Sequence, residues 1–296
     1  MSSDIRVAVV GLDTSHSIEF TRRMQAPDCP EDQKVSGLKA VTCLRFETPF
    51  QDKVGLDARQ KQMEEWGVKV SESFEETVAD CDAIMLEIND PAYHVEYFTK
   101  CAALGKPIFL DKPIAPNLKD AKVIMDLIKA NNAKVFSSSS LRFSAQLKAA
   151  SGQVSVPRSS MVYGPLGIAP AGSSVVWYGV HSFEMLVRCM GVGATKLTAV
   201  STDSGVISVV EYEDGRTGIV DLTKDAWAYG GILRDQNAVV PFAVEISNIY
   251  TEELTEIAAF FAGGPSPVCL KETLEVTALL DATEASIATG ASQTIG

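Results

Sequence analysis

Short apolar runs alternate with amphipathic stretches in the first half of the chain, and this alternation leaves few folds open. Residues 5–11 and 83–88 are nearly continuous in apolar side chains, as strands buried on both faces of a sheet are. Residues 18–24 and 118–131 have the apolar spacing of amphipathic helices. Strands that alternate with helices in this way predict an α/β fold, with a doubly wound parallel sheet over residues 1–136.

The pattern changes after this region. A chain of 296 residues exceeds the roughly 250 residues of a usual single core, so we expect a second domain over residues 137–296. Asp214 and Gly215, between two strand-like runs, form a strong hairpin signal. Strands grouped into hairpins predict a mainly antiparallel sheet with helices on one face, which is an α+β domain. Here the sequence predicts strands at residues 196–202, 206–213, 217–223 and 239–249, and helices at residues 181–190, 251–262 and 271–289.

The charge balance excludes some partners. The net charge is −12, from 26 basic against 38 acidic residues, and the basic residues form no block. This argues against nucleic acid or an anionic membrane as a partner. No apolar run approaches the roughly 18 residues of a membrane span, and the first strand follows residue 4 without room for a targeting segment. The six cysteines and three histidines are isolated from one another, so we expect a cytoplasmic protein with reduced thiols and no metal.

A lysine stands at the exit of a short predicted strand. Residues 108–110 run into Asp111, Lys112 and Pro113. The proline cannot extend a hydrogen-bond ladder and keeps Lys112 in extended geometry, so the lysine is expected at the carboxyl edge of the sheet. Open α/β sheets bind their ligands at that edge. A lysine there could exchange a proton with an alcohol or carbonyl oxygen; the alternative is a solvated Asp–Lys pair in a turn.

The turn after the first strand departs from a dinucleotide-binding pattern. Only the first glycine of G-x-G-x-x-G is present, at Gly11, while Asp13 and His16 hold the other two positions. Thr14 or Ser15 can cap the following helix, whose N-terminus favours an anion. A carboxylate aimed at a pyrophosphate would cost about 3–4 kcal/mol at ~4–5 Å and an effective dielectric near 20. Either Asp13 points away, or the usual phosphate cradle is not used.

Two further strand ends carry candidate ligand contacts. Arg45 and Glu47 follow the second predicted strand, where a glutamate favours the ribose of NAD and an arginine tolerates the 2′-phosphate of NADP. A surface ion pair is the alternative for these two residues. Asn89 and His94 follow the strand at residues 83–88, and His94 opens a helix. Its alternative role is that of a helix-start histidine with satisfied hydrogen bonds.

Taken in order along the chain, these features resemble the Gfo/Idh/MocA family, the glucose-fructose oxidoreductase and inositol dehydrogenase-like enzymes. The resemblance extends over nearly the whole chain. No single motif is specific, but their joint order is hard to obtain by chance. The motifs are Pro91-x-x-His94, A-x-x-x-G-K at residues 102–106, Asp111-Lys112-Pro113 in place of Glu-Lys-Pro, Arg142-Phe143, Gly179-Val180-His181 followed by Glu184, and the closing segments 250–261 and 268–272.

The resemblance implies a Rossmann domain that binds NAD or NADP and a second domain whose sheet often forms the interface of a homo-oligomer, a dimer or tetramer. It implies hydride transfer at a secondary alcohol of a small-molecule substrate, a sugar, cyclitol or related polyol. Lys112 would position the substrate and assist proton transfer, and His181 would be the general acid and base, since an ordinary histidine pKa of about 6.5 suits that task. The implied cofactor contacts are Gly11, Asp13, Thr14, Ser15, His16, Glu47, Asn89, His94, Asp111 and Lys112, and the implied substrate contacts are Arg142, Trp177 and Glu184.

Two departures from the family keep other hypotheses open. Trp177 stands where the family often has a catalytic aspartate, four residues before His181, and a tryptophan cannot stabilise an imidazolium by charge. Glu184, one helical turn later, could partly substitute. With the altered turn, this motivates a second hypothesis, a non-catalytic family member that acts as a small-molecule sensor or structural subunit. In a third, Asp13 and His16 bind a metal that bridges to phosphate, with two further ligands that the sequence does not identify.

Overall fold

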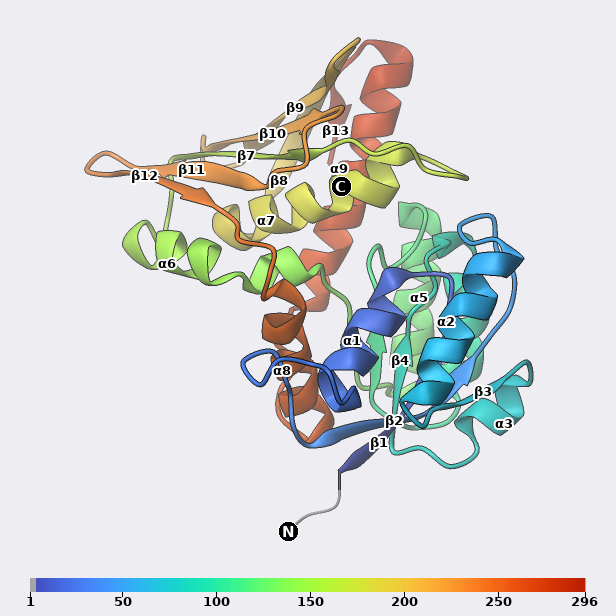
Figure 1. Ribbon diagram of the computed structural model, residues 1–296. Helices are drawn as coiled ribbons and strands as arrows, with labels where there is room; N and C mark the ends of the chain where they lie inside the picture. Colours follow the sequence, from blue (N-terminus) through green and yellow to red (C-terminus); the bar gives the residue numbers. More distant parts are fainter. Residues whose placement is uncertain (1–3, 296) are drawn as a thin grey trace. The chain divides into compact units, whose positions relative to one another are not determined.

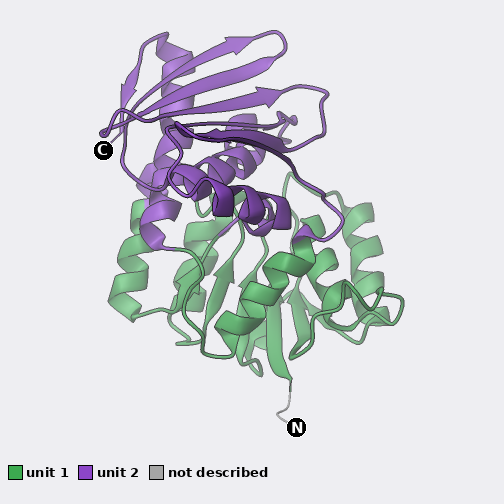
Figure 2. Cartoon of the chain, turned by 90° about the vertical axis from the view of Figure 1, so that its left-hand side faces the viewer, with its two compact units in different colours: residues 1–115, 122–137, 250–268 green, residues 116–121, 138–249, 269–296 purple. Residues whose placement is uncertain are grey.

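The computed structural model describes residues 4–295. The chain folds into two compact units, coloured separately in Figure 2. Unit 1 comprises Met1–Ala115, Lys122–Ser137 and Tyr250–Val268, and unit 2 comprises Pro116–Ala121, Ser138–Ile249 and Cys269–Gly296. Residues 250–268 therefore group with the N-terminal sheet, although in the chain they follow six of the seven strands of the second sheet.

Unit 1 contains a six-stranded sheet in the order β3-β2-β1-β4-β5-β6 (Figure 1). Every neighbouring pair of strands is parallel, which confirms the predicted doubly wound sheet. The strand order reverses between β1 and β4, and open α/β sheets bind their ligands at such a point. The strands are β1 (Ile5–Val10), β2 (Leu38–Leu44), β3 (Lys69–Ser71), β4 (Ala83–Leu86), β5 (Ile108–Leu110) and β6 (Val135–Phe136).

A row of aromatic side chains joins the helices of unit 1 to its sheet. Phe20 lies 6.0 Å from Phe109, Phe109 lies 5.2 Å from Phe136, and Phe136 lies 5.1 Å from Phe260, as ring centroids. The outer two rings belong to α1 and α8, and the inner two to β5 and β6. Edge-on aromatic contacts of this kind add to the burial of apolar area, so they fix both helices on the sheet. The helices are α1 (Ser15–Gln25), α2 (Lys53–Glu65), α3 (Phe74–Val78), α4 (His94–Ala102), α5 (Leu118–Asn131) and α8 (Ile249–Phe261), with a 3-10 turn η1 (Pro91–Tyr93).

Unit 2 contains a seven-stranded sheet in the order β12-β11-β7-β10-β9-β8-β13. All neighbours are antiparallel except β7 and β10, and the hairpin at Asp214-Gly215 joins β9 to β10 as predicted. β7 and β11 were not predicted, and the expected strand at residues 239–249 ends at Ala243. The strands are β7 (Ser159–Pro165), β8 (Ala194–Thr202), β9 (Gly205–Tyr212), β10 (Thr217–Thr223), β11 (Gly230–Arg234), β12 (Val239–Ala243) and β13 (Gln293–Thr294).

The helices of unit 2 cover one face of its sheet (Figures 1 and 2). On β9, Ser208 contacts the hydroxyl of Thr283 in α9, while Ile207 and Val209, which point to the opposite face, are exposed. Among the described residues, no helix is long and apolar enough to cross a membrane. The helices are α6 (Ala145–Gln153), α7 (Val180–Met190) and α9 (Leu270–Thr289), with a 3-10 turn η2 (Ser140–Phe143) and a π-helical turn η3 (Val175–Gly179).

The turn after β1 requires a glycine at its first position. Gly11 has a φ of +115°, and an added Cβ would lie 2.3 Å from the carbonyl oxygen of Glu87. We expect Gly11→Ala to lower the free energy of unfolding by about 3 kcal/mol or more, from backbone strain and steric overlap together. Gly37 is the control, because its φ is +90° but no atom lies within 4 Å of an added Cβ. Gly37→Ala should cost about 1 kcal/mol. Urea denaturation followed by circular dichroism measures both, and equal losses would contradict the close approach at Gly11.

Candidate functional site

The side chain of Asp13, at the carboxyl edge of the unit 1 sheet, is hydrogen-bonded to other residues of the protein. Its Oδ2 accepts a hydrogen bond from the hydroxyl of Thr48 at 2.7 Å, and its Oδ1 accepts one from the backbone N–H of Asn89 at 2.9 Å. Burial raises the pKa of Asp13, and these two hydrogen bonds oppose that rise. The carboxylate therefore links the turns that follow β1, β2 and β4.

The head of α1 is capped as predicted. The hydroxyl of Thr14 accepts a hydrogen bond from the N–H of His16 at 3.1 Å, and Ser15 is the exposed residue of the turn. The imidazole of His16 is buried, with the ring of Tyr250 edge-on at 5.2 Å between centroids. The position of the third glycine is therefore filled by a ring that points into unit 1.

His16 meets the Asp-Lys-Pro turn after β5. Its Nδ1 lies 2.8 Å from Oδ2 of Asp111, an ion-pair contact without the angles of a hydrogen bond. The other carboxylate oxygen, Oδ1, accepts a hydrogen bond from the backbone N–H of Lys112 at 2.7 Å. Burial opposes ionisation of Asp111, but the charges of His16 and Lys112 outweigh it and lower the pKa of Asp111 to about 2. Asp111 thus holds the backbone of Lys112 at the sheet edge.

A wholly buried carboxyl group, Glu87, lies beside this pair. Burial, together with the charges of Asp111 and Glu253, raises the pKa of Glu87 well above its usual range. Glu87 is not among the site residues predicted from the sequence, although a glutamate inside the apolar run at residues 83–88 is a visible signal. Such a residue in a buried strand end needs a partner, because an isolated buried charge is strongly disfavoured.

His94 is wholly buried in the packing of unit 1. Its Nε2 lies 2.7 Å from the carbonyl oxygen of Ile88, and its Nδ1 lies 3.2 Å from that of Ile114. Both ring nitrogens thus contact backbone carbonyls. His94 joins the β4 turn to the segment just after Pro113, so it supports the turn that carries Lys112.

Glu47 lies apart from these residues, in a polar hollow at the end of β2. The hollow has a volume of about 490 Å³. Arg45 is engaged there by Asp57 and Gln60, each at 2.5 Å, while Glu47 is exposed. The residues that line the hollow are Arg45, Phe46, Glu47, Lys53, Asp57 and Glu72.

In unit 2, His181 stands in the first turn of α7, directly after the π-helical turn η3. Its Nδ1 lies 2.6 Å from the hydroxyl oxygen of Ser139. The rings of Tyr178 and Tyr229 stand edge-on to the imidazole, at 6.2 and 5.8 Å between centroids. Tyr178 also contacts Trp177 and Trp227, at 4.7 and 5.6 Å. His181 is therefore held by a hydroxyl and flanked by aromatic rings.

Sequence reasoning did not identify Ser139. Ser139 lies in a run of four serines at residues 137–140, which carries no local signal of a functional role. Its pairing with His181 spans 42 positions, and no local spacing reveals it.

Arg142 and Glu184 form a buried ion pair in unit 2. Nη1 of Arg142 lies 3.0 Å from Oε2 of Glu184, and Nη2 of Arg142 contacts Glu272. Burial raises the pKa of Glu184, and the charge of Arg142 opposes that rise. Glu184 is thus paired with Arg142, and the group on Nδ1 of His181 is Ser139.

Comparisons with known proteins agree with this architecture. Residues 5–139 match the family model described as "Oxidoreductase family, NAD-binding Rossmann fold", GFO_IDH_MocA. A comparison with curated proteins finds no match.

Several solved structures share the fold over the whole chain. One is a myo-inositol dehydrogenase from Corynebacterium glutamicum ATCC 13032, at 14% identity over 99% of each chain, with a TM-score of 0.80. A second is the apo scyllo-inositol dehydrogenase from Lactobacillus casei, at 15% identity over 99% of this chain and 98% of that one, with a TM-score of 0.81. A third is GenD2 from gentamicin A biosynthesis in complex with NAD, at 14% identity over 100% of this chain and 97% of that one, with a TM-score of 0.81.

At such low identity these likenesses show the fold alone, and they confirm the predicted combination of a parallel and a mainly antiparallel sheet. The predicted resemblance is confirmed as well, since residues 5–139 match the model of the Gfo/Idh/MocA oxidoreductase family with its NAD-binding Rossmann fold.

Proposed function

We propose that the protein is an NAD(P)-dependent dehydrogenase that acts on a secondary alcohol or ketone of a sugar, cyclitol or related polyol. The observation that carries the proposal is the NAD-binding oxidoreductase domain at residues 5–139, with Lys112 at the carboxyl edge of its sheet. Two of the structures that share the fold are named as inositol dehydrogenases, which supports a polyol as the substrate class.

The residues of the β1 turn fit a dinucleotide. The backbone at Gly11 lies close against Glu87, and the exposed Ser15 lies at the N-terminus of α1, where anions are favoured. The charge of Asp13 is already met by the donors of Thr48 and Asn89. This removes the main objection to a pyrophosphate at the turn. When bound, the cofactor supplies the nicotinamide carbon that accepts or gives the hydride.

The proton of the reacting hydroxyl is assigned to His181. Ser139 contacts Nδ1 and so fixes the orientation of the imidazole, the group that exchanges the proton with substrate. Trp177, Tyr178 and Tyr229 supply aromatic surface against which the C–H face of a sugar or cyclitol ring packs. Lys112 positions the substrate oxygen, and Asp111 fixes the backbone that carries it.

The hollow at the end of β2 favours NAD over NADP. It holds three carboxylates, of Glu47, Asp57 and Glu72, against two cations. Both cations, Arg45 and Lys53, are bound to Asp57, and Arg45 is also bound to Gln60. A 2′-phosphate there would meet like charge, whereas a ribose hydroxyl can donate to Glu47.

We therefore expect NADH to bind at least about tenfold more tightly than NADPH, a difference of about 1.4 kcal/mol. Glu47→Gln should reduce this preference, and Glu65→Gln, an exposed glutamate outside the hollow, should not. Titration followed by nicotinamide fluorescence measures both affinities. Equal binding of NADH and NADPH to the unaltered protein would contradict the assignment of Glu47.

Removal of either proposed catalytic side chain should abolish turnover without unfolding the protein. We expect His181→Ala to lower kcat by about 10²–10⁴-fold and to leave NADH binding intact, because general acid–base catalysis contributes that factor. Lys112→Ala should lower kcat as well. Lys100→Ala is the matched control, since this lysine pairs with Glu96 on the exposed side of α4. Steady-state assays with a panel of inositols and sugars give the rates, and full activity of both variants would refute the assignment.

The departures in the site support a second candidate function. Trp177 replaces the aspartate typical of the family, and Ser139 on Nδ1 of His181 carries no charge. A protein that binds a polyol without oxidising it would show dinucleotide or polyol binding and no turnover. Measurable turnover with bound NADH would exclude this sensor or structural role.

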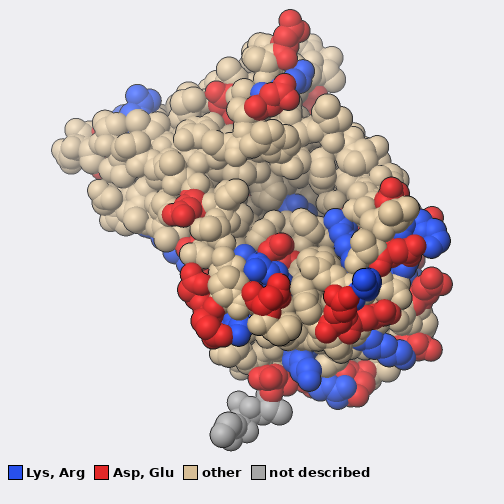
Figure 3. Space-filling view, viewed as in Figure 1, with Lys and Arg blue, Asp and Glu red and all other residues tan. Residues whose placement is uncertain are grey.

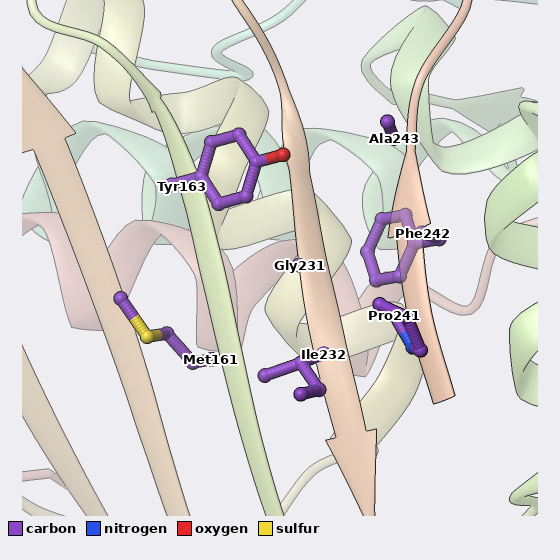
Figure 4. A pocket seen from close by; sticks show the side chains of 7 residues that line it. All are labelled: Met161, Tyr163, Gly231, Ile232, Pro241, Phe242 and Ala243. Atoms are coloured by element: carbon purple, nitrogen blue, oxygen red, sulfur yellow. The ribbon is translucent and has the colours of Figure 1, made fainter. Parts of the chain in front are cut away.

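We also propose a homo-oligomer through the sheet of unit 2. Val209, Ile219, Met161, Ile232 and Pro241 lie side by side in register across five strands of that sheet. The last three line an apolar hollow of about 550 Å³ with Tyr163, Gly231, Phe242 and Ala243 (Figure 4).

In the face shown in Figure 3 most charged side chains lie over unit 1, and few lie over unit 2. A sheet face that carries an apolar row of this kind suits a second copy of the chain. We also propose a cytoplasmic location, because the cysteines are free and thiols stay reduced in that compartment.

A further inference from the structure

Three carboxyl groups are buried together beneath the Lys112 turn of unit 1. Glu87 and Glu253 are 0% exposed, and Asp111 is 1% exposed. The charges of Asp111 and Glu253 both act on Glu87. The cationic groups that act on Asp111 are Lys112 and, when protonated, His16. Carboxylates this close repel one another in a buried site, so a cation among them would stabilise the charged forms of Glu87 and Asp111.

The polar atoms of this cluster lack ordinary partners. Both carboxyl oxygens of Glu87, Oδ2 of Asp111 and Nδ1 of His16 are buried without a hydrogen bond from any described residue. Native proteins satisfy the large majority of such atoms, so each exception requires an explanation. Nδ1 of His16 and Oδ2 of Asp111 lie 2.8 Å apart and contact each other, whereas the two oxygens of Glu87 have no hydrogen bond and face this pair. This arrangement points to a ligand shared by the three side chains.

The geometry and the donor atoms suit a metal ion. One ligand atom each from His16, Glu87 and Asp111 lie within 4.8 Å of one another. Two ligands on opposite sides of a cation at about 2.0–2.2 Å are at most about 4.4 Å apart, so binding requires only a small closing movement. One imidazole nitrogen with carboxylate oxygens favours Zn²⁺, Mn²⁺ or Fe²⁺ over Mg²⁺ and Ca²⁺, which prefer oxygen alone.

We propose that His16, Glu87 and Asp111 bind one divalent transition-metal cation inside unit 1. With His16 neutral, the two positive charges of the cation balance the carboxylates of Glu87 and Asp111. The site does not depend on the proposed dehydrogenase activity, since binding requires neither substrate nor turnover. The sequence predicts no metal because its cysteines and histidines are isolated from one another, and the three ligands proposed here come from separate turns. Its minor alternative paired His16 with Asp13, whereas Asp13 is bonded to Thr48 and Asn89.

The test is metal binding by the full chain in the absence of dinucleotide. The protein is stripped with EDTA, loaded with Zn²⁺ or Mn²⁺, passed through a desalting column and analysed by mass spectrometry of the metal. We expect about one ion per chain and a metal-dependent rise in melting temperature, because a ligand that binds the folded state stabilises it. Co²⁺ loading should give a visible spectrum typical of nitrogen and oxygen ligands.

Isosteric variants distinguish metal binding by these carboxyl groups from a role in folding alone. Glu87→Gln and Asp111→Asn should weaken binding at least tenfold and lose the metal-dependent rise in melting temperature. Glu184→Gln is the matched control, because Glu184 is an equally buried carboxyl group but has Arg142 as its partner. It should retain the metal. Circular dichroism confirms that each variant is folded.

Two results would overturn the proposal. One is the absence of bound metal in a folded wild-type protein at millimolar Zn²⁺ and Mn²⁺, with an infrared band of a protonated carboxyl group that disappears in Glu87→Gln. That result would mean that Glu87 stays neutral instead of binding a cation. The other is equal metal binding by wild type and Glu87→Gln, which would place the ion elsewhere.

Discussion

The close approach of the β1 turn to the β4 turn is the constraint on which unit 1 depends. At Gly11 a side chain would overlap the carbonyl of Glu87, and two residues later Asp13 bonds the N–H of Asn89 in the same turn. These turns lie on either side of the point where the strand order reverses. The distance between the two turns is therefore set by Gly11, which has no Cβ, and by the carboxylate of Asp13. A ligand bound at that edge of the sheet contacts these turns.

At each of the two positions where the glycine pattern is altered, the larger side chain meets two complementary groups of unit 1. Asp13 brings a charge that Thr48 and Asn89 satisfy, and His16 brings a ring that Asp111 and Tyr250 accommodate. The doubly wound sheet thus forms although two of the three glycines of the pattern are absent, because Asp13 and His16 each meet complementary groups within unit 1. The pattern of glycines is one way to build this turn, and buried polar pairs are another.

Local periodicity explains which parts of the fold the sequence predicts. The helix α5 and the strand β10 have the predicted bounds, since each carries its own apolar spacing. β11 carries no such signal, because it begins with Gly230 and Gly231, whose missing side chains make room for Tyr163 and the carbonyl of Met161. Its strand character comes from neighbours on β7, about 70 residues earlier in the chain.

The same limit applies to the site. Lys112 was placed correctly at the end of a strand, from a strand-proline signal that is entirely local. The role of Ser139 could not be predicted because its partner His181 is distant in sequence. The chemistry of Glu87 depends likewise on His16 and Asp111, which only the folded sheet brings to it.

The aromatic row from Phe20 to Phe260 bears on how the chain folds as it is synthesised. Phe260 belongs to a segment that emerges from the ribosome only after strands β7 to β12 of the second sheet, yet its ring packs against Phe136 in the first. Domains usually fold as units, the N-terminal one first. Here the N-terminal sheet is complete only when α8 has been synthesised. A nascent chain therefore exposes the apolar surface around Phe136 until residues 250–268 pack on it. Chaperones that recognise exposed apolar surface would find it on this intermediate.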